Sequence, residues 1–240
     1  MARSLGTRHR FTIAYLALGA IVGAALGAFI VLANRPGPKP TPPWSRWQPT
    51  EASVGATAQA IASHIGGSYR LPDGRQVARI VTAAPSQAAG NVEAIALADR
   101  PNAVTVYPTT GSILYTLCGT EQNCRLTEES TRSGAAVLRR EALELALYTL
   151  KYSKATDVAV FFPPAQGVNG SSSVLFFPRE DFSSELKHPL NVTLPHPVGR
   201  GKVDRRELST IDQLTGGRRY SFGVETASGG RRVLLLSPIA

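Results

Sequence analysis

The sequence is poor in the residues that build metal and redox centres, with two cysteines, four histidines and one methionine among 240 residues. Cys118 and Cys124 are too far apart for a redox C-x-x-C motif, and no histidine pair complements them as zinc ligands. The sequence also lacks H-E-x-x-H, P-loop, G-x-G-x-x-G and G-x-S-x-G motifs. We therefore expect no metal, no cofactor and no catalytic residue from these classes.

Acidic residues are also scarce relative to basic ones. Lys and Arg together number 26, whereas Asp and Glu number 17, which gives a formal net charge of +9. A surplus of this sign is compatible with contact to anionic lipid headgroups or acidic envelope polymers. We do not expect nucleic acid as a partner, because the arguments below put most of the chain outside the cytoplasm.

One long apolar run, residues 11–33, contains no charged residue, and arginines flank it on both sides. As a helix, its 23 residues would be about 35 Å long, against about 30 Å of bilayer hydrocarbon. The run predicts a transmembrane helix in contact with the lipid bilayer, preceded by a cytoplasmic tail over residues 1–10. A secretory signal cleaved after Ala33 is the alternative, but its apolar region would span only about 7–15 residues.

The orientation of this helix does not follow from flanking charge, because both flanks are basic. The cysteines favour a cytoplasmic N-terminus and an external C-terminal domain. Within the run, Gly19, Gly23 and Gly27 recur at every fourth position and form a strip of minimal side chains on one helix face. Such a strip favours a homodimer or contact with another membrane protein, although small residues are common in membrane helices generally.

The two cysteines are expected to pair with each other. Cys118 follows a strand-like stretch, and the polar, glycine-containing loop that leads to Cys124 can turn tightly. In an oxidising compartment, an isolated close pair is most simply a disulfide. The sequence therefore predicts a Cys118–Cys124 bond that fixes one loop.

The remaining chain divides into a linker and one domain. Six prolines between residues 36 and 49 predict an extended linker over residues 34–49, in which Trp44 and Trp47 could rest at the membrane surface or pack on the domain. Residues 50–240 are expected to form one extracytoplasmic α+β domain with a mixed or antiparallel sheet and a few helices. The apolar spacing predicts helices over 58–65, 137–152 and 179–187, and strands over 69–71, 75–81, 92–98, 103–107, 113–117, 158–162, 174–177, 220–225 and 232–236.

Two stretches carry a resemblance to a known group of proteins. One is Tyr-Thr-Leu-Cys-Gly at 115–119 with Cys124, and the other is Leu-Arg-Arg-Glu-Ala-Leu-Glu-Leu-Ala-Leu-Tyr at 138–148. With the apolar run and the proline linker, they resemble uncharacterised single-pass membrane proteins of high-GC Gram-positive bacteria. The resemblance implies the same topology and the disulfide, and it implies no activity.

An enzymatic alternative comes from the sortase transpeptidases, which this chain resembles in size, in its N-terminal anchor and in a β-rich external domain. Their chemistry uses a histidine, a cysteine and an arginine, and His64, Cys118 and Arg125 stand in that order. The match departs from the sortase pattern, because Tyr115-Thr116-Leu117 precedes the cysteine and Cys124 offers it a disulfide partner. The preferred hypothesis is a non-catalytic, membrane-anchored binding or scaffolding module of the cell envelope.

Overall fold

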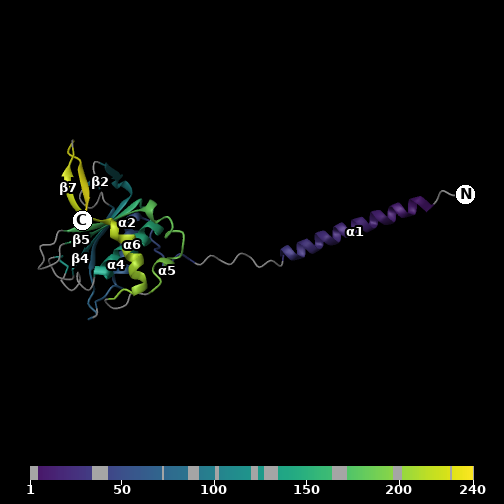
Figure 1. Cartoon of the computed structure of the whole chain (residues 1–240), viewed down its shortest axis with the longest axis horizontal. Helices are drawn as coiled ribbons and strands as arrows, with labels where there is room; N and C mark the ends of the chain where they lie inside the picture. Colours follow the sequence, from purple (N-terminus) through teal and green to yellow (C-terminus); the bar gives the residue numbers. More distant parts are fainter. Residues whose placement is uncertain are drawn as a thin grey trace. The chain divides into compact units, whose positions relative to one another are not determined.

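The computed structural model contains two compact units, Met1–Pro42 and Pro43–Ala240 (Figure 1). The structure describes residues 5–33, 43–71, 73–85, 92–100, 103–119, 124–126, 135–163, 172–196, 202–227 and 229–239. The greater part of the predicted proline linker, residues 34–42, lies outside this range.

The first unit contains a single described helix, α1 (Leu5–Ala33). Its side chains are described over residues 15–31 and are exposed, including Leu16, Ile21 and Phe29. Within the described residues, no helix reaches the combined length and hydropathy of a membrane span. The helix expected over residues 11–33 is thus present as secondary structure, and its insertion into a bilayer stays a prediction.

The second unit is an α+β domain built on an eight-stranded mixed sheet, as the sequence predicts at this level of detail. Its helices are α2 (Val54–Gly66), α4 (Ala135–Tyr152), α5 (Leu190–Thr193) and α6 (Arg205–Thr215). Its strands are β1 (Arg79–Pro85), β2 (Val92–Arg100), β3 (Ala103–Pro108), β4 (Ser112–Cys118), β5 (Asp157–Phe162), β6 (Ser173–Pro178), β7 (Arg219–Thr226) and β8 (Arg232–Pro238). In Figure 1, helices α2, α4 and α6 lie together beside strands β4 and β5.

The strand order is β1-β4-β5-β6-β7-β8-β2-β3, so β1 and β3 are the two edges of the sheet. The pairs β4–β5 and β2–β8 are parallel, and the other neighbouring pairs are antiparallel. Chain neighbours β3 and β4 stand far apart in this order although only η2 (Thr109–Gly111) separates them in the sequence. A flat sheet could not accommodate so short a connection.

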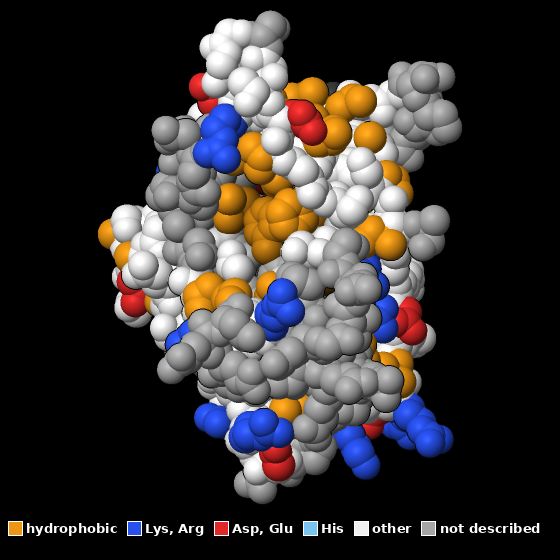
Figure 2. Space-filling model, turned by 90° about the vertical axis from the view of Figure 1, so that its left-hand side faces the viewer, with side chains coloured by type: hydrophobic (Ala, Val, Ile, Leu, Met, Phe, Trp, Pro, Cys, Tyr) orange, Lys and Arg blue, Asp and Glu red, His pale blue; other side chains and the backbone are white. Residues whose placement is uncertain are grey.

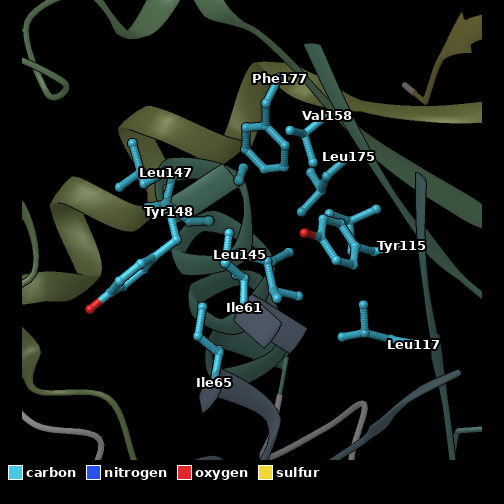
Figure 3. Close-up of a cluster of buried hydrophobic side chains, with 14 of the residues drawn as sticks. Ile61, Ile65, Tyr115, Leu117, Leu145, Leu147, Tyr148, Val158, Leu175 and Phe177 are labelled. Atoms are coloured by element: carbon cyan, nitrogen blue, oxygen red, sulfur yellow. The ribbon is translucent and has the colours of Figure 1, made fainter. Parts of the chain in front are cut away.

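The larger hydrophobic core lies between the sheet and the helices. Side chains alternate along a strand, so every second residue of β4, β5 and β6 faces α2 and α4. Figure 3 shows side chains from both layers meeting in this core. The residues drawn include Ile61 and Ile65 of α2, Leu145 of α4, Tyr115 of β4, Val158 of β5 and Phe177 of β6, all buried. The buried Tyr115 hydroxyl lies 2.6 Å from the Thr149 hydroxyl of α4, so its polar end is satisfied.

A second core lies on the other face and shows how the sheet curls. Only two residue pairs join β6 to β7, at Val174–Tyr220 and Leu175–Arg219. The rings of Tyr107 (β3) and Phe176 (β6) nevertheless approach to 5.0 Å between centroids, although four strand spacings would separate them by about 19 Å in a flat sheet. The half of the sheet formed by β7, β8, β2 and β3 therefore bends back over the other half.

The outer side of this second core is partly open. Tyr107, Phe161 and Phe222 pack against it and are only partly buried. Figure 2, which looks at the left-hand side of Figure 1, shows hydrophobic side chains gathered in a hollow near the centre of that face.

Two local predictions need correction, and one helix was not predicted. The segment expected to form a helix over 179–187 contains a short 3₁₀ helix, η3 (Arg179–Phe182), followed by turns. The hairpin expected over 69–81 forms only next to its turn, where an antiparallel bridge joins Arg70 to Gln76 and the Leu71 and Val77 backbone N–H groups donate to the Arg75 and Tyr69 carbonyl oxygens. The regular strand β1 begins only at Arg79. Helix α6 was not predicted, although Asp204 caps it through a 2.8 Å hydrogen bond from the Arg206 backbone N–H.

Candidate functional site

The predicted disulfide is present at the end of β4. Cys118 and Cys124 are bonded, with their Cα atoms 4.4 Å apart. The Gly119 backbone N–H donates to the Cys124 carbonyl oxygen at 3.2 Å. A Cβ atom at Gly119 would lie 1.8 Å from the Arg125 carbonyl oxygen, so only glycine fits this close crossing of the backbone.

Removing this bond with the pair Cys118→Ala and Cys124→Ala is expected to lower the free energy of unfolding by about 2.4 kcal/mol, the loop entropy of a bridge this short. Urea denaturation of residues 43–240 under oxidising conditions measures this loss. Dithiothreitol should lower the stability of the wild type by a similar amount and leave the double variant unchanged. An unchanged midpoint in both experiments would show that the bond does not stabilise the fold.

The residues proposed for sortase-like chemistry are not assembled into a site. The His64 ring of α2 stacks on Trp47, with 4.0 Å between centroids and 8° between planes, and burial lowers the pKa of His64 below its ordinary value. The sulfur of Cys118 is bonded to Cys124, and Arg125 follows that bond in the chain. Among the described residues, no contact joins His64 to Cys118.

The two tryptophans belong to the globular unit. Trp44 is 8% exposed, and its indole N–H donates to the Glu185 carbonyl oxygen at 3.1 Å. Its ring meets Tyr148 edge-on at 5.3 Å, on the same surface of α4 that Trp47 approaches. The segment that follows the proline-rich stretch is thus packed against the domain, which answers a question that the sequence left open.

The three glycines of the predicted association strip, Gly19, Gly23 and Gly27, lie within α1. A Cβ atom at any of them would meet nothing within 4 Å in this chain. The use of this strip by another helix stays a prediction.

A cluster of buried charges, missed at the level of sequence, lies between α4 and α6. Arg140 of α4 is 3% exposed, and its Nε donates to Glu207 Oε2 of α6 at 2.9 Å. Its Nη1 donates to the Tyr69 hydroxyl at 2.7 Å and to Glu144 Oε2 at 3.1 Å, while Nη2 donates to the His196 carbonyl oxygen at 2.7 Å. One guanidinium group thus links α4 to three other segments of the chain, at Tyr69, His196 and Glu207.

The partners of Arg140 are themselves linked. The Tyr69 hydroxyl donates to Glu144, and the His196 backbone N–H donates to Glu207 Oε1 at 2.9 Å. Burial would lower the pKa of Arg140, but Tyr69, Glu207 and Glu144 outweigh it and raise that pKa above its ordinary value. Burial and the neighbouring Glu144 raise the pKa of Tyr69. The cluster therefore holds the permanently charged guanidinium of Arg140 between the carboxylates of Glu144 and Glu207, and it joins α4 to α6.

Glu141, which follows Arg140 in α4, is a second buried ionisable residue. Its side chain is completely buried, and neither carboxyl oxygen has a hydrogen-bond partner among the described residues. Burial, followed by repulsion from Glu144, raises the pKa of Glu141 well above its ordinary value. The buried position of Glu141 therefore favours the neutral form of its carboxyl group.

The clearest candidate for a binding surface is the edge strand β3. It pairs with β2 on one side, from Ala94–Pro108 to Arg100–Ala103, and stands at the end of the strand order. Val104 is 55% exposed and Val106 is 62% exposed. The strand contains no charged residue, and its one proline, Pro108, stands at its last position, so residues 103–107 lack the charges and prolines by which natural edge strands usually prevent pairing with other chains.

A shallow pocket of 210 Å³ lies between residues 184–193 and α6, and Ser184 and His188 contribute to its lining. His188 Nδ1 contacts the Ser184 carbonyl oxygen at 2.9 Å. A hydrogen bond from Nδ1–H to this carbonyl leaves Nε2 as the basic atom, but among the described residues no hydroxyl group is hydrogen-bonded to the His188 ring, so no activated serine is assembled here.

No protein-family model, curated protein or solved structure matches this chain. Its function has to be inferred from the molecule itself.

Proposed function

We propose that this chain is a membrane-anchored binding module whose globular unit lies outside the cytoplasm and binds a partner strand along β3. The support for the anchor is the uncharged run over residues 11–33, which extends on both sides beyond the side chains described over residues 15–31. The resemblance to single-pass membrane proteins agrees with this topology.

The support for an extracytoplasmic domain is the Cys118–Cys124 bond, because structural disulfides persist in oxidising compartments and are rare in the cytosol. The packing of Trp44 and Trp47 on α4 and α2 starts the globular unit close behind the proline-rich segment. The globular unit would therefore begin at Pro43, ten residues after the predicted anchor ends at Ala33.

The single observation that carries the binding function is the exposed, uncharged edge of β3. An edge strand presents backbone N–H and C=O groups that an added strand can pair with, and its side chains supply specificity. Val104 and Val106 lie on the same face of the strand because side chains alternate. Together they offer a small apolar ridge beside the row of backbone groups.

Photo-crosslinking in native membranes tests this function. We expect a photoreactive amino acid at Thr105 to capture a partner, whereas the same group at Val224, on the internal strand β7, should not. Adding Val104→Lys and Val106→Lys should remove the Thr105 adduct, because two charges on the ridge oppose strand addition. Equal labelling at Thr105 and Val224, or an adduct that survives both lysines, would contradict binding at β3.

A further inference from the structure

We infer that the strand added to β3 is β3 of a second copy of this chain, paired antiparallel about a two-fold axis at Thr105. This inference rests on the proposed function, since it names the partner of the same strand. It commits to an isologous contact, in which each copy uses the same surface.

The register of such a contact suits the exposed side chains of β3. With Thr105 opposite Thr105 of the second copy, Val104 lies opposite Val106 of the second copy, and the reverse pair forms by symmetry. Each copy thereby covers the two exposed valines of the other with a β-branched side chain, a favourable cross-strand pairing. At its centre the pairing uses residues 104–106 of each strand, all of them exposed.

Charge also favours a contact between two β3 strands. The globular unit, residues 43–240, contains 21 Lys and Arg and 17 Asp and Glu, so two copies carry net charge of the same sign, and a contact without charged side chains avoids like-charge pairs. Residues 103–108 contain no charged side chain, and a two-fold contact there sets no like charges directly opposite one another. The opposite edge strand, β1, begins with Arg79 and does not offer the same uncharged edge. A strongly acidic partner, by contrast, would find no basic residue on β3 to recognise.

Confinement in a membrane would strengthen the same contact. If the anchor holds each copy in the membrane, all copies share one plane and one distance from the bilayer, which raises their effective concentration. The predicted association strip of Gly19, Gly23 and Gly27 on α1 would favour the same pair.

Cysteine crosslinking of the full chain in native membranes tests the contact. Thr105→Cys should form a disulfide-linked dimer, because Cα atoms directly opposite in an antiparallel pair lie about 4.5–5.5 Å apart. The matched control is Val81→Cys, an exposed position on the other edge strand. We expect about tenfold more dimer from Thr105→Cys than from Val81→Cys on non-reducing gels.

Two further variants test the register. Val104→Cys alone should crosslink poorly, because its diagonal neighbour in the second copy is about 7–8 Å away. Val104→Cys combined with Val106→Cys should crosslink strongly. Equal yields from Thr105→Cys and Val81→Cys, or no dimer from either, would overturn the inference. In that event, a Thr105 photo-adduct with a protein of different mass would leave the proposed binding function intact.

Discussion

Replacing Arg140 with methionine is expected to lower the free energy of unfolding by about 3–5 kcal/mol, the cost of leaving a buried charge without its partner. Glu207 is only 2% exposed and would keep its carboxylate inside the fold without the guanidinium that neutralises it. Tyr69 and the His196 carbonyl oxygen would lose hydrogen bonds at the same time. Urea denaturation of residues 43–240 measures the change.

The neighbouring Arg139 provides the matched control. It also forms a salt bridge with α6, at 2.6 Å to Asp212, but both side chains are substantially exposed to solvent. Arg139→Met should therefore cost about 0–1 kcal/mol. Similar losses for the two variants would show that the Arg140 cluster behaves as a surface ion pair and does not lock α4 to α6.

Replacing Glu141 with glutamine is expected to stabilise the protein near neutral pH and to change little in acid. In the unfolded chain this carboxyl ionises at its ordinary pKa, whereas in the folded protein burial keeps it protonated to higher pH. The folded state then binds one more proton than the unfolded state, so the wild type loses about 1.4 kcal/mol for each pH unit between the two pKa values. Glutamine has nearly the same shape and carries no charge at any pH, so it removes this loss.

Unfolding curves at pH 4.5, 6.0 and 7.5 test this prediction, with the stability difference between variant and wild type growing as the pH rises. Glu93→Gln, at an exposed position of β2, is the control and should shift stability little at any pH. If Glu141→Gln instead destabilises the protein equally at all three pH values, then Glu141 is ionised and paired in the folded state.

The sequence predicts the helices and strands in which apolar residues recur at a regular spacing over a short stretch. The apolar runs of β5 and β6 and the wide apolar face of α4 indicated the correct elements, because their patterns are complete within a few turns or strands. The disulfide was also predictable, since two cysteines with one possible partner leave a single choice. Helix α6 was overlooked because its polar composition hides a narrow apolar stripe around Ile211.

The candidate sites were less accessible to prediction. Arg140 joins α4 to residues 67 and 56 positions away, at Glu207 and His196, and no local pattern encodes these pairings. One feature of the sequence indicated buried charges, because Arg140 and Glu141 interrupt an otherwise apolar face of the predicted helix. β3 is exposed because of the strand order, in which its neighbour β2 pairs on the other side with β8, the last strand in the sequence. An apolar strand in the sequence looks the same whether it becomes a central strand or an edge.

Membrane anchoring and an extracytoplasmic domain are tested together by mapping the cysteines on protein taken from native membranes under thiol-blocking, non-reducing conditions. Cys118 and Cys124 fall within one tryptic peptide, because no lysine or arginine lies between them. We expect this peptide to be recovered from the membrane fraction with both sulfurs bonded to each other and neither one alkylated. Recovery with both thiols alkylated, or recovery from the soluble fraction, would contradict the proposed topology.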